Sequence, residues 1–174
     1  MKAAVCGARK PFEAGSLALA WVLGKELALS GFVVVTGATL GVSLEAARGA
    51  KAVGGKVFGV SPAATKSEHV EKFGYPVDEF DEIDFSGRGV LGRNILIVER
   101  SDVVLFVDGG VGTLNEFSIA LQLKKPIGVL EGQMGVAGNA KTLLEIVGLA
   151  DFGQFFSESD PKKLVEKIFG AIKK

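Results

Sequence analysis

The sequence has very few residues that form crosslinks or bind metals. Its 174 residues include one cysteine, Cys6, and one histidine, His69. A single cysteine cannot form an internal disulfide, and neither residue stands in the spacing that metal sites use. We therefore expect no metal site and no resident cofactor. A reducing compartment fits this cysteine usage, so the predicted location is cytoplasmic.

Excess charge and long apolar runs are also missing. The 20 Lys and Arg residues balance 20 Asp and Glu residues, so the formal net charge is zero. The broad basic field of a nucleic-acid-binding protein is therefore not expected. No apolar run approaches the roughly 18 residues that a membrane span needs. The predicted partner is a small ligand, with neither nucleic acid nor a membrane.

What the chain does contain is a regular alternation of short apolar runs and helical segments. With 48% hydrophobic residues, its length suits one domain, predicted to span residues 1–174. This alternation predicts an α/β fold, a Rossmann-like three-layer sandwich with a mostly parallel sheet and helices on both faces. Strands are expected at 2–6, 32–36, 56–60, 103–107 and 126–130, and a weaker one at 80–85. Helices are expected at 14–30, 43–53, 91–100, 113–124 and after Asp160-Pro161.

Two polar or glycine-rich segments interrupt this pattern. Residues 66–78 hold Gly74 and Pro76 and are predicted to form a surface excursion with one helical turn. His69 stands there among charged residues and is expected to be solvated. Residues 131–140 are predicted to form a loop.

Two glycine-rich turns follow predicted strands. One is Asp108-Gly109-Gly110-Val111-Gly112-Thr113, and the other is Gly37-Ala38-Thr39-Leu40-Gly41. Glycines let backbone amides converge without side-chain obstruction, and the helix that follows presents unpaired N–H groups and its positive dipole end. Both turns would lie at the carboxyl edge of the sheet, where α/β proteins bind ligands. The sequence therefore predicts an anion site there, although glycines also suit any tight connection.

Two charged residues near the turn at 108–113 have competing interpretations. Thr113-Leu114-Asn115-Glu116 is a capping-box sequence, in which Thr113 caps the helix and Glu116 reaches back to its amide. Alternatively, Glu116 faces a ribose above the turn. Arg93 is expected near a helix N-terminus, where positive charge is disfavoured, so it should have an acidic partner or a ligand anion. Arg88 is a second candidate for the same role.

At this point the residues resemble a known family. Gly92-Arg93-Asn94, followed fifteen residues later by Asp108 to Glu116, looks like the paired signature of the Lonely guy (LOG) family, Arg-Lys followed by PGGxGTxxE. Val5-Cys6-Gly7-Ala8 and Thr36-Gly37-Ala38-Thr39, then Gly41, are similar to its first two strand–turn units. The resemblance covers most of residues 1–130. The same fold includes molybdenum-cofactor carrier proteins, and some relatives carry a lysine-decarboxylase label.

The resemblance implies specific roles. LOG enzymes are phosphoribohydrolases that split a cytokinin nucleoside 5'-monophosphate into free base and ribose 5-phosphate. By this likeness Arg93 and Glu116 would be catalytic, and a homodimer or higher homo-oligomer is implied, with the helix at 113–124 as a possible interface or simply core. The implied phosphate- and nucleotide-binding residues are Gly109, Gly110, Val111, Gly112, Thr113, Gly7, Gly37, Thr39 and Gly41.

The chain departs from the family pattern at three places. Asp108 replaces the motif proline, Asn94 replaces the lysine after the arginine, and the upstream YGGG pattern reads Thr36-Gly37-Ala38-Thr39. A carboxylate at position 108 would repel a phosphate unless it points away. Two functions therefore stay open: a nucleoside 5'-monophosphate phosphoribohydrolase, and a non-catalytic carrier of a nucleotide or of the molybdenum (pterin) cofactor.

Three other enzyme classes are disfavoured by the residues. An NAD-dependent oxidoreductase needs its glycine fingerprint after the first strand, where this chain reads Cys6-Gly7-Ala8-Arg9. No lysine stands in a context that suggests a pyridoxal phosphate Schiff base. Ser16 and Ser43 have no histidine nearby to act as a general base, which argues against a serine nucleophile.

Overall fold

The computed structural model describes residues 1–13 and 15–172 of the chain. The strands are β1 Lys2–Gly7, β2 Val33–Thr36, β3 Val57–Ser61, β4 Glu82–Phe85, β5 Val103–Val107, β6 Ile127–Leu130 and β7 Phe155–Glu158. The helices are α1 Gly15–Leu29, α2 Val42–Lys51, α3 Gly89–Glu99, α4 Val111–Gln122, α5 Gly135–Gly138, α6 Ala140–Ile146 and α7 Pro161–Ile172. A short π-helix, η1, covers Glu68–Lys72.

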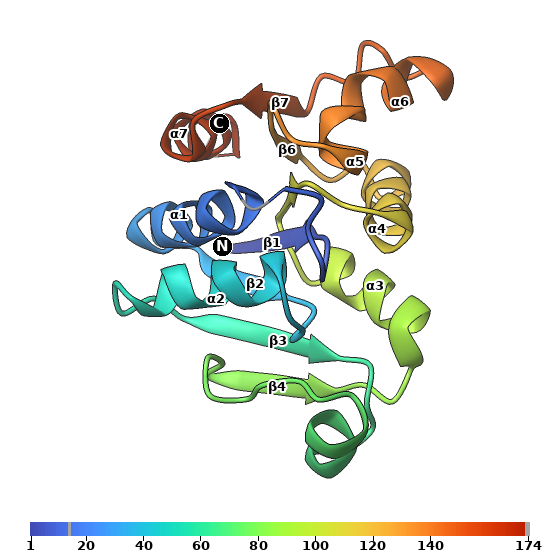
Figure 1. The fold of residues 1–174 in the computed structure, drawn as a ribbon. Helices are drawn as coiled ribbons and strands as arrows, with labels where there is room; N and C mark the ends of the chain where they lie inside the picture. Colours follow the sequence, from blue (N-terminus) through green and yellow to red (C-terminus); the bar gives the residue numbers. More distant parts are fainter. Residues whose placement is uncertain (14, 173–174) are drawn as a thin grey trace.

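The seven strands form one sheet in the order β4-β3-β2-β1-β5-β6-β7, and every neighbouring pair is parallel. Helices α1, α2 and α7 cover one face, and α3, α4 and α5 cover the other (Figure 1). The predicted fold, a Rossmann-like α/β sandwich of three layers, is confirmed.

The central strands are buried on both faces because helices cover both. All five residues of β5 are buried, and four of them are valine or leucine side chains that pack well on a pleated surface. Small residues then bring α1 and α2 close together: a methyl group on Gly24 would collide with the backbone of Ala46. The first residue of α2, Val42, donates from its amide to the carbonyl of Ala8 at 3.1 Å. The N-terminus of α2 is thereby fixed beside the loop that follows β1.

The strand order reverses direction at β1. The chain lays down β2, β3 and β4 on one side of β1, then crosses through α3 and places β5 on the other side. The loops after β1 and β5 therefore diverge, which leaves a crevice at the carboxyl ends of these strands. This crevice is where α/β proteins of this kind bind ligands.

Most elements match the predicted ones, but the C-terminal third differs. The strand β7 and the helix α6 were not predicted, and α5 lies inside the segment expected to be a loop. These elements are short, with four, seven and four residues, and glycines surround them. Short elements give too few residues for a periodic pattern to emerge.

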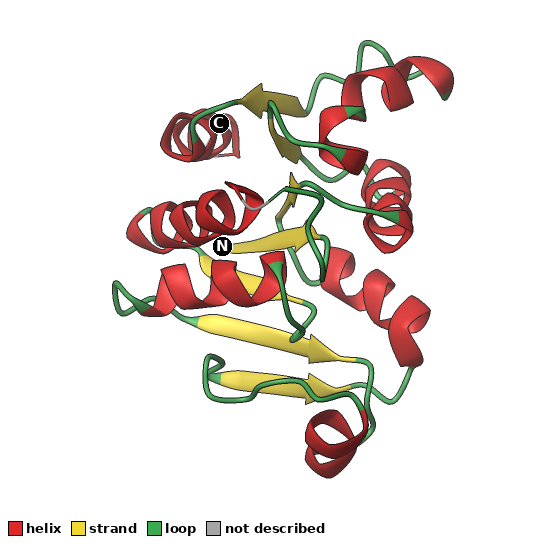
Figure 2. Cartoon of the chain, in the orientation of Figure 1, coloured by secondary structure: helices red, strands yellow, loops and turns green. Residues whose placement is uncertain are grey.

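The prediction for His69 was wrong. The segment between β3 and β4 does form a surface excursion with one helical turn, seen as an isolated helix beside β4 (Figure 2). His69, however, is fully buried inside it. Its Nδ1 lies 2.8 Å from the Ser61 hydroxyl, and its Nε2 lies 3.0 Å from the carbonyl oxygen of Pro76. Because that carbonyl can only accept, its hydrogen bond requires a proton on Nε2.

Candidate anion-binding cleft

A cleft of about 410 Å³ opens at the carboxyl ends of β1 and β5. Three segments supply most of its wall: the loop after β1, the first half of α3 and the start of α4. Its lining residues are Gly7, Ala8, Arg9, Lys10, Phe12, Thr39, Ser43, Tyr75, Val90, Arg93, Asn94, Gly110, Gly112, Thr113 and Glu116. The cleft therefore lies at the reversal of strand order, as the topology requires.

The glycine turn after β5 presents a bare helix N-terminus to this cleft. Helix α4 begins at Val111, and its N-cap Gly110 makes no side-chain capping bond. A methyl group on Gly110 or on Gly112 would meet no atom within 4 Å, so both face open space. The first N–H groups of α4 are thus available to an anion, with the helix dipole behind them.

The capping-box interpretation of Thr113 and Glu116 was wrong. Because α4 starts two residues earlier than predicted, Thr113 already lies within the first turn and cannot be the N-cap. Glu116 lies in the second turn of α4, where its carboxylate faces the cleft instead of the helix end. The helix begins earlier because Gly110, in an extended conformation, serves as its N-cap.

Asp108 turns its carboxylate away from the cleft. Its side chain is fully buried, and its Oδ2 accepts from the backbone amide of Phe12 at 2.7 Å and from the Ser16 hydroxyl at 3.3 Å. The other oxygen, Oδ1, accepts from the amide of Gly109 at 2.5 Å. The expected repulsion of a ligand phosphate is therefore relieved, but the Gly109 amide is already occupied. Asp108 also has a φ of 60°, a left-handed conformation that proline cannot adopt.

Arg93 lies in the first half of α3 and is buried with 8% of its surface exposed. Its Nη1 donates to the carbonyl of Gly37 at 2.7 Å, so the turn after β2 holds the guanidinium in place. Its charge acts on Glu116 and lowers the pKa of that carboxyl, although less than burial raises it. Arg88, the other cation considered for this role, is exposed at the N-cap of α3 and is outside the cleft lining.

Burial dominates the electrostatics of Glu116. Removal from water raises its pKa to about 7, against the opposing effects of the Arg93 charge and of a hydrogen bond with the Cys6 thiol. The same burial, together with the neighbouring Glu116, raises the pKa of Cys6 well above its ordinary value. The carboxyl therefore exchanges its proton near neutral pH, while the thiol stays protonated and poorly reactive.

Three buried polar atoms around the cleft have no hydrogen-bond partner among the described residues. They are Oγ1 of Thr39, Nε of Arg93 and Oδ1 of Asn94. Asn94 uses its amide nitrogen instead, which donates to Asn115 Oδ1 at 2.9 Å. Buried polar groups are nearly always paired in native proteins, so three orphaned atoms at one cleft indicate groups that a ligand would satisfy.

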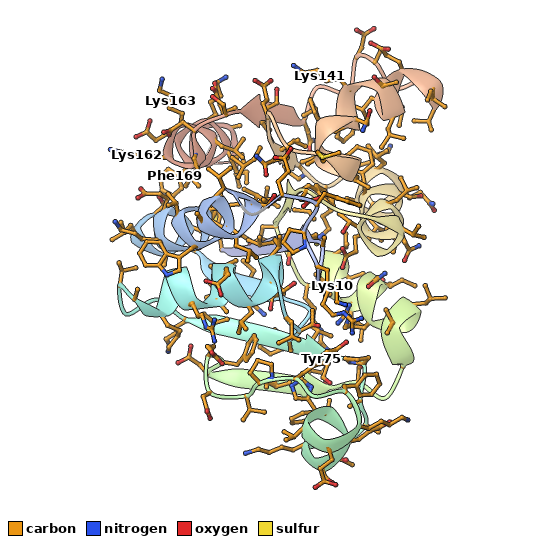
Figure 3. All side chains as sticks on the ribbon, in the orientation of Figure 1. Lys10, Tyr75, Lys141, Lys162, Lys163 and Phe169 are labelled. Atoms are coloured by element: carbon orange, nitrogen blue, oxygen red, sulfur yellow. The ribbon has the colours of Figure 1, made fainter. Side chains whose placement is uncertain are left out.

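Cations and aromatic rings complete the rim. Arg9 and Lys10 are exposed on the loop after β1, and with Arg93 they outnumber the one carboxylate of the lining, Glu116. Lys10 and the largely buried Tyr75 both lie at the carboxyl ends of the strands (Figure 3). Phe12 is 58% exposed at the rim. A planar, negatively charged ligand would find complementary charge and apolar surface here.

The structure brings together most of the residues predicted for the site. Those that line the cleft are Arg93, Glu116, Gly110, Gly112, Thr113, Gly7 and Thr39. The other four lie behind or beside it: Gly37 contacts Arg93, Gly41 packs on the backbone of Arg9, Gly109 bonds to Asp108, and Val111 is 86% exposed.

Sequence reasoning missed several lining residues. Arg9 and Lys10 follow the first strand directly, so their place at the carboxyl edge was available from the pattern. Ser43 was considered as a nucleophile and not as an anion ligand. Nothing in the sequence placed Tyr75 at the cleft, because it reaches the cleft from the irregular segment between β3 and β4.

The described residues contain neither a membrane-spanning helix nor a cluster of metal ligands. No helix there is both long and apolar enough to cross a membrane. No group of three or more His, Cys, Asp or Glu side chains is placed to hold a metal ion in residues 1–13 and 15–172.

Comparisons with known proteins place this geometry in a family. An uncharacterised protein of Archaeoglobus fulgidus is 30% identical over 120 residues, which cover 69% of this chain and 74% of that protein. The molybdenum cofactor binding protein from the phototrophic bacterium Rippkaea orientalis is 28% identical, with a TM-score of 0.82 over 99% of this chain and 98% of that chain. The molybdenum cofactor carrier protein MCP from Chlamydomonas reinhardtii is also 28% identical, with a TM-score of 0.79 over the full length of both.

The model of the SLOG cluster4 family matches residues 1–165. This match and the carrier-protein structures confirm the resemblance drawn from the motifs at 92–94 and 108–116. The chain belongs to the SLOG cluster4 family.

Proposed function

We propose that the protein binds and carries a phosphorylated heterocycle of the nucleotide or molybdenum-cofactor class. The phosphate would bind to the open N-terminal turn of α4, at Gly110, Gly112 and Thr113. The heterocycle would extend across the cleft toward Tyr75. The metal of a molybdenum cofactor is cargo in this proposal, and the protein supplies the donors that hold the organic part.

The observation that carries the proposal is the set of orphaned polar atoms around the cleft. Thr39, Arg93 and Asn94 each bury an atom without a partner, and each lines the same cleft. Leaving a buried donor or acceptor unpaired costs about 1–3 kcal/mol, so a ligand that satisfies these atoms gains that free energy on binding.

The similar proteins support the carrier role over a catalytic one. The solved structures from Rippkaea orientalis and Chlamydomonas reinhardtii, which cover essentially the whole chain, are described as a molybdenum cofactor binding protein and a carrier protein. The departures from the LOG motif at Asp108 and Asn94 are consistent with holding a ligand without cleaving it.

The test uses a substitution that fills the phosphate site without disturbing the protein. Gly112→Leu places a side chain where no protein atom lies within 4 Å. Gly170→Leu is its matched control, because Gly170 is also helical, exposed and unobstructed but lies in α7. Binding of AMP is measured by the change in protein fluorescence. Binding of molybdenum cofactor, released from a donor enzyme, is measured by the molybdenum that stays with the protein.

We expect Gly112→Leu to weaken binding by more than roughly tenfold, the equivalent of about 1.4 kcal/mol, and Gly170→Leu to bind as the unmodified protein does. Equal binding by both variants would place the ligand elsewhere. Failure of the unmodified protein to bind either compound would refute the proposal.

One specific observation favours a second function, nucleoside 5'-monophosphate hydrolysis. Glu116 has a pKa of about 7 and lies within the electrostatic reach of Arg93, which is the behaviour of a general acid or base. In that reaction water adds to C1' of the ribose, the bond from C1' to the base nitrogen breaks, and the base takes up a proton. A carboxylate would stabilise the oxocarbenium-like transition state.

Hydrolysis is tested by incubating the protein with AMP and other nucleoside monophosphates and measuring free base and ribose 5-phosphate. Under this second proposal product forms, and Glu116→Gln abolishes it while Gly170→Leu does not. Absence of product, or product formation that Glu116→Gln leaves unchanged, eliminates hydrolysis and leaves the carrier proposal standing.

A further inference from the structure

The cleft has a second helix N-terminus besides that of α4. Helix α2 has ten residues and begins at Val42, and its N-cap Gly41 makes no side-chain capping bond. The amide of Val42 is used by Ala8, whereas Ser43 lines the cleft with 5% of its surface exposed. Ser43 therefore brings the N-terminal end of α2, and with it the positive end of the helix dipole, to the wall of the cleft.

Thr39 points independently to a ligand at this place. It lines the cleft just before α2, it is 93% buried, and its Oγ1 has no partner among the described residues. Arg9 and Lys10, on the adjacent loop, supply positive charge on the same wall.

The two helix N-termini reach the cleft from strands on opposite sides of β1. Strands β2 and β5, which lead into α2 and α4, flank β1 on opposite sides. Adjacent strands lie about 4.8 Å apart, so the ends of β2 and β5 are separated by about 9.5 Å. Hydrogen bonds reach about 3 Å, so an oxyanion held at the end of β5 lies beyond the reach of donors at the end of β2, the side of β1 on which Thr39 lies.

We propose that Thr39, Ser43 and the N-terminal turn of α2 form a second oxyanion subsite in the cleft. This inference rests on the proposed function and narrows its ligand class. The ligand is a phosphorylated heterocycle that carries a second tetrahedral oxyanion group at its other end, whether a further phosphate or an oxo-metal group. A nucleoside monophosphate with a neutral base would fill one subsite and leave the orphaned Thr39 hydroxyl unsatisfied.

The experiment follows two amide groups separately, using inorganic phosphate and molybdate as probes. In ¹H–¹⁵N spectra of the whole chain, the amide of Ser43 reports on the proposed subsite and that of Thr113 reports on the α4 turn. The variants are Thr39→Val, Thr39→Ser, Gly112→Leu and the control Gly170→Leu. Thr39→Val should fold normally, since it removes a hydroxyl that bonds to no described residue and keeps nearly the same volume.

We expect both amides to shift with independent dissociation constants. Thr39→Val should weaken the response of Ser43 at least fivefold and leave that of Thr113 unchanged, Thr39→Ser should restore it, and Gly112→Leu should show the reverse pattern. Preference for phosphate or molybdate at Ser43 identifies the second group.

Two results would overturn the subsite. One is a Ser43 response that is missing or insensitive to Thr39→Val. The other is a single dissociation constant for both amides that both variants abolish, which would mean one shared ion. Failure of the proposed function is a different result, namely a Thr113 response and cofactor binding that Gly112→Leu leaves intact.

Discussion

Arg93 lies directly against Gly37, with its Nη1 donating to the Gly37 carbonyl at 2.7 Å. A methyl group on Gly37 would stand 2.9 Å from both Cζ and Nη1 of that guanidinium, which is closer than Cβ atoms approach other atoms in real structures. The residue after β2 therefore determines where the buried cation of the cleft lies. The glycine there leaves space for the guanidinium and does not serve an unusual backbone conformation, so a side chain at position 37 would push the guanidinium aside.

We expect Gly37→Ala to displace the Arg93 guanidinium and weaken anion binding in the cleft by roughly tenfold, or about 1.4 kcal/mol. Titration calorimetry with AMP measures the affinity, and urea denaturation checks that the fold is kept. Gly153→Ala is the control, because a methyl group there meets no atom within 4 Å and Gly153 lies outside the cleft. Unchanged affinity in Gly37→Ala would show that the position of Arg93 does not matter to the ligand.

Glu116 should make the protein less stable as the pH rises. Its pKa is about 7 in the folded chain and near 4.5 when unfolded, so between these values the folded state binds more protons. The free energy of unfolding therefore falls as the pH increases from about 4.5 to about 7 and is level above that. Glu116→Gln, which cannot ionise, should be more stable than the unmodified protein at pH 8, by on the order of 2–3 kcal/mol.

The difference between the two proteins is the informative quantity. Asp81, Glu68 and Glu131 have lowered pKa values and lose stabilising interactions in acid, but they contribute equally to both proteins and cancel. Urea denaturation at pH 4.5, 6, 7 and 8 should show the gain of Glu116→Gln growing with pH. A gain that is constant over this range would mean that Glu116 does not titrate there.

The sequence predicted the fold well where elements are long and buried. Strand β5 is an uninterrupted apolar run, and β1 to β3 follow the same pattern, so the central sheet was legible. Strand β7 lies at the edge of the sheet and is half-buried along its length. Its four residues show no alternation of apolar and polar side chains that would mark a strand. Its existence depends on pairing with β6, a tertiary interaction that no local pattern encodes.

The sequence predicted the position of the backbone turn at the site better than the roles of its side chains. The glycines of the turn at 108–113 and the spacing to Arg93 located the cleft. Whether Thr113 capped a helix depended on where α4 starts. A start two residues earlier than expected placed Glu116 in the second turn, facing the cleft and not the helix end. The burial of His69 could not be anticipated from its charged neighbours, because these lie on the outer side of a π-helix whose inner side holds the imidazole.

Ser61 should contribute to stability through His69. The Ser61 hydroxyl accepts from the amide of Ala63 at 3.0 Å and lies 2.8 Å from His69 Nδ1, all in a buried setting. Ser61→Ala would leave both groups unpaired, so we expect a loss of about 1–3 kcal/mol in the free energy of unfolding. Ser118→Ala, at an exposed position in α4, is the control and should change it by less than about 0.5 kcal/mol. Similar values for both variants would contradict the buried hydrogen bond.

Asp108 offers the sharpest comparison between this chain and the LOG motif, which has proline at that position. Asp108 has a φ of 60°, whereas a proline ring fixes φ near −65°, so the motif residue cannot follow this backbone. Asparagine tolerates the left-handed conformation and keeps one acceptor oxygen for Phe12 or Gly109. We therefore expect Asp108→Asn to lower the free energy of unfolding by about 1 kcal/mol, and Asp108→Pro to lower it by about 3 kcal/mol or more.

Urea denaturation of the two variants measures this difference, and the amide signals of Phe12 and Gly109 report the loss of their acceptor. Asp108→Ala separates the two causes, because alanine removes the carboxylate without imposing the proline ring, and its stability should fall between the other two. If Asp108→Pro were as stable as Asp108→Asn, the turn would adopt the motif conformation without cost. The left-handed conformation of Asp108 would then not be what separates this turn from the proline of the motif.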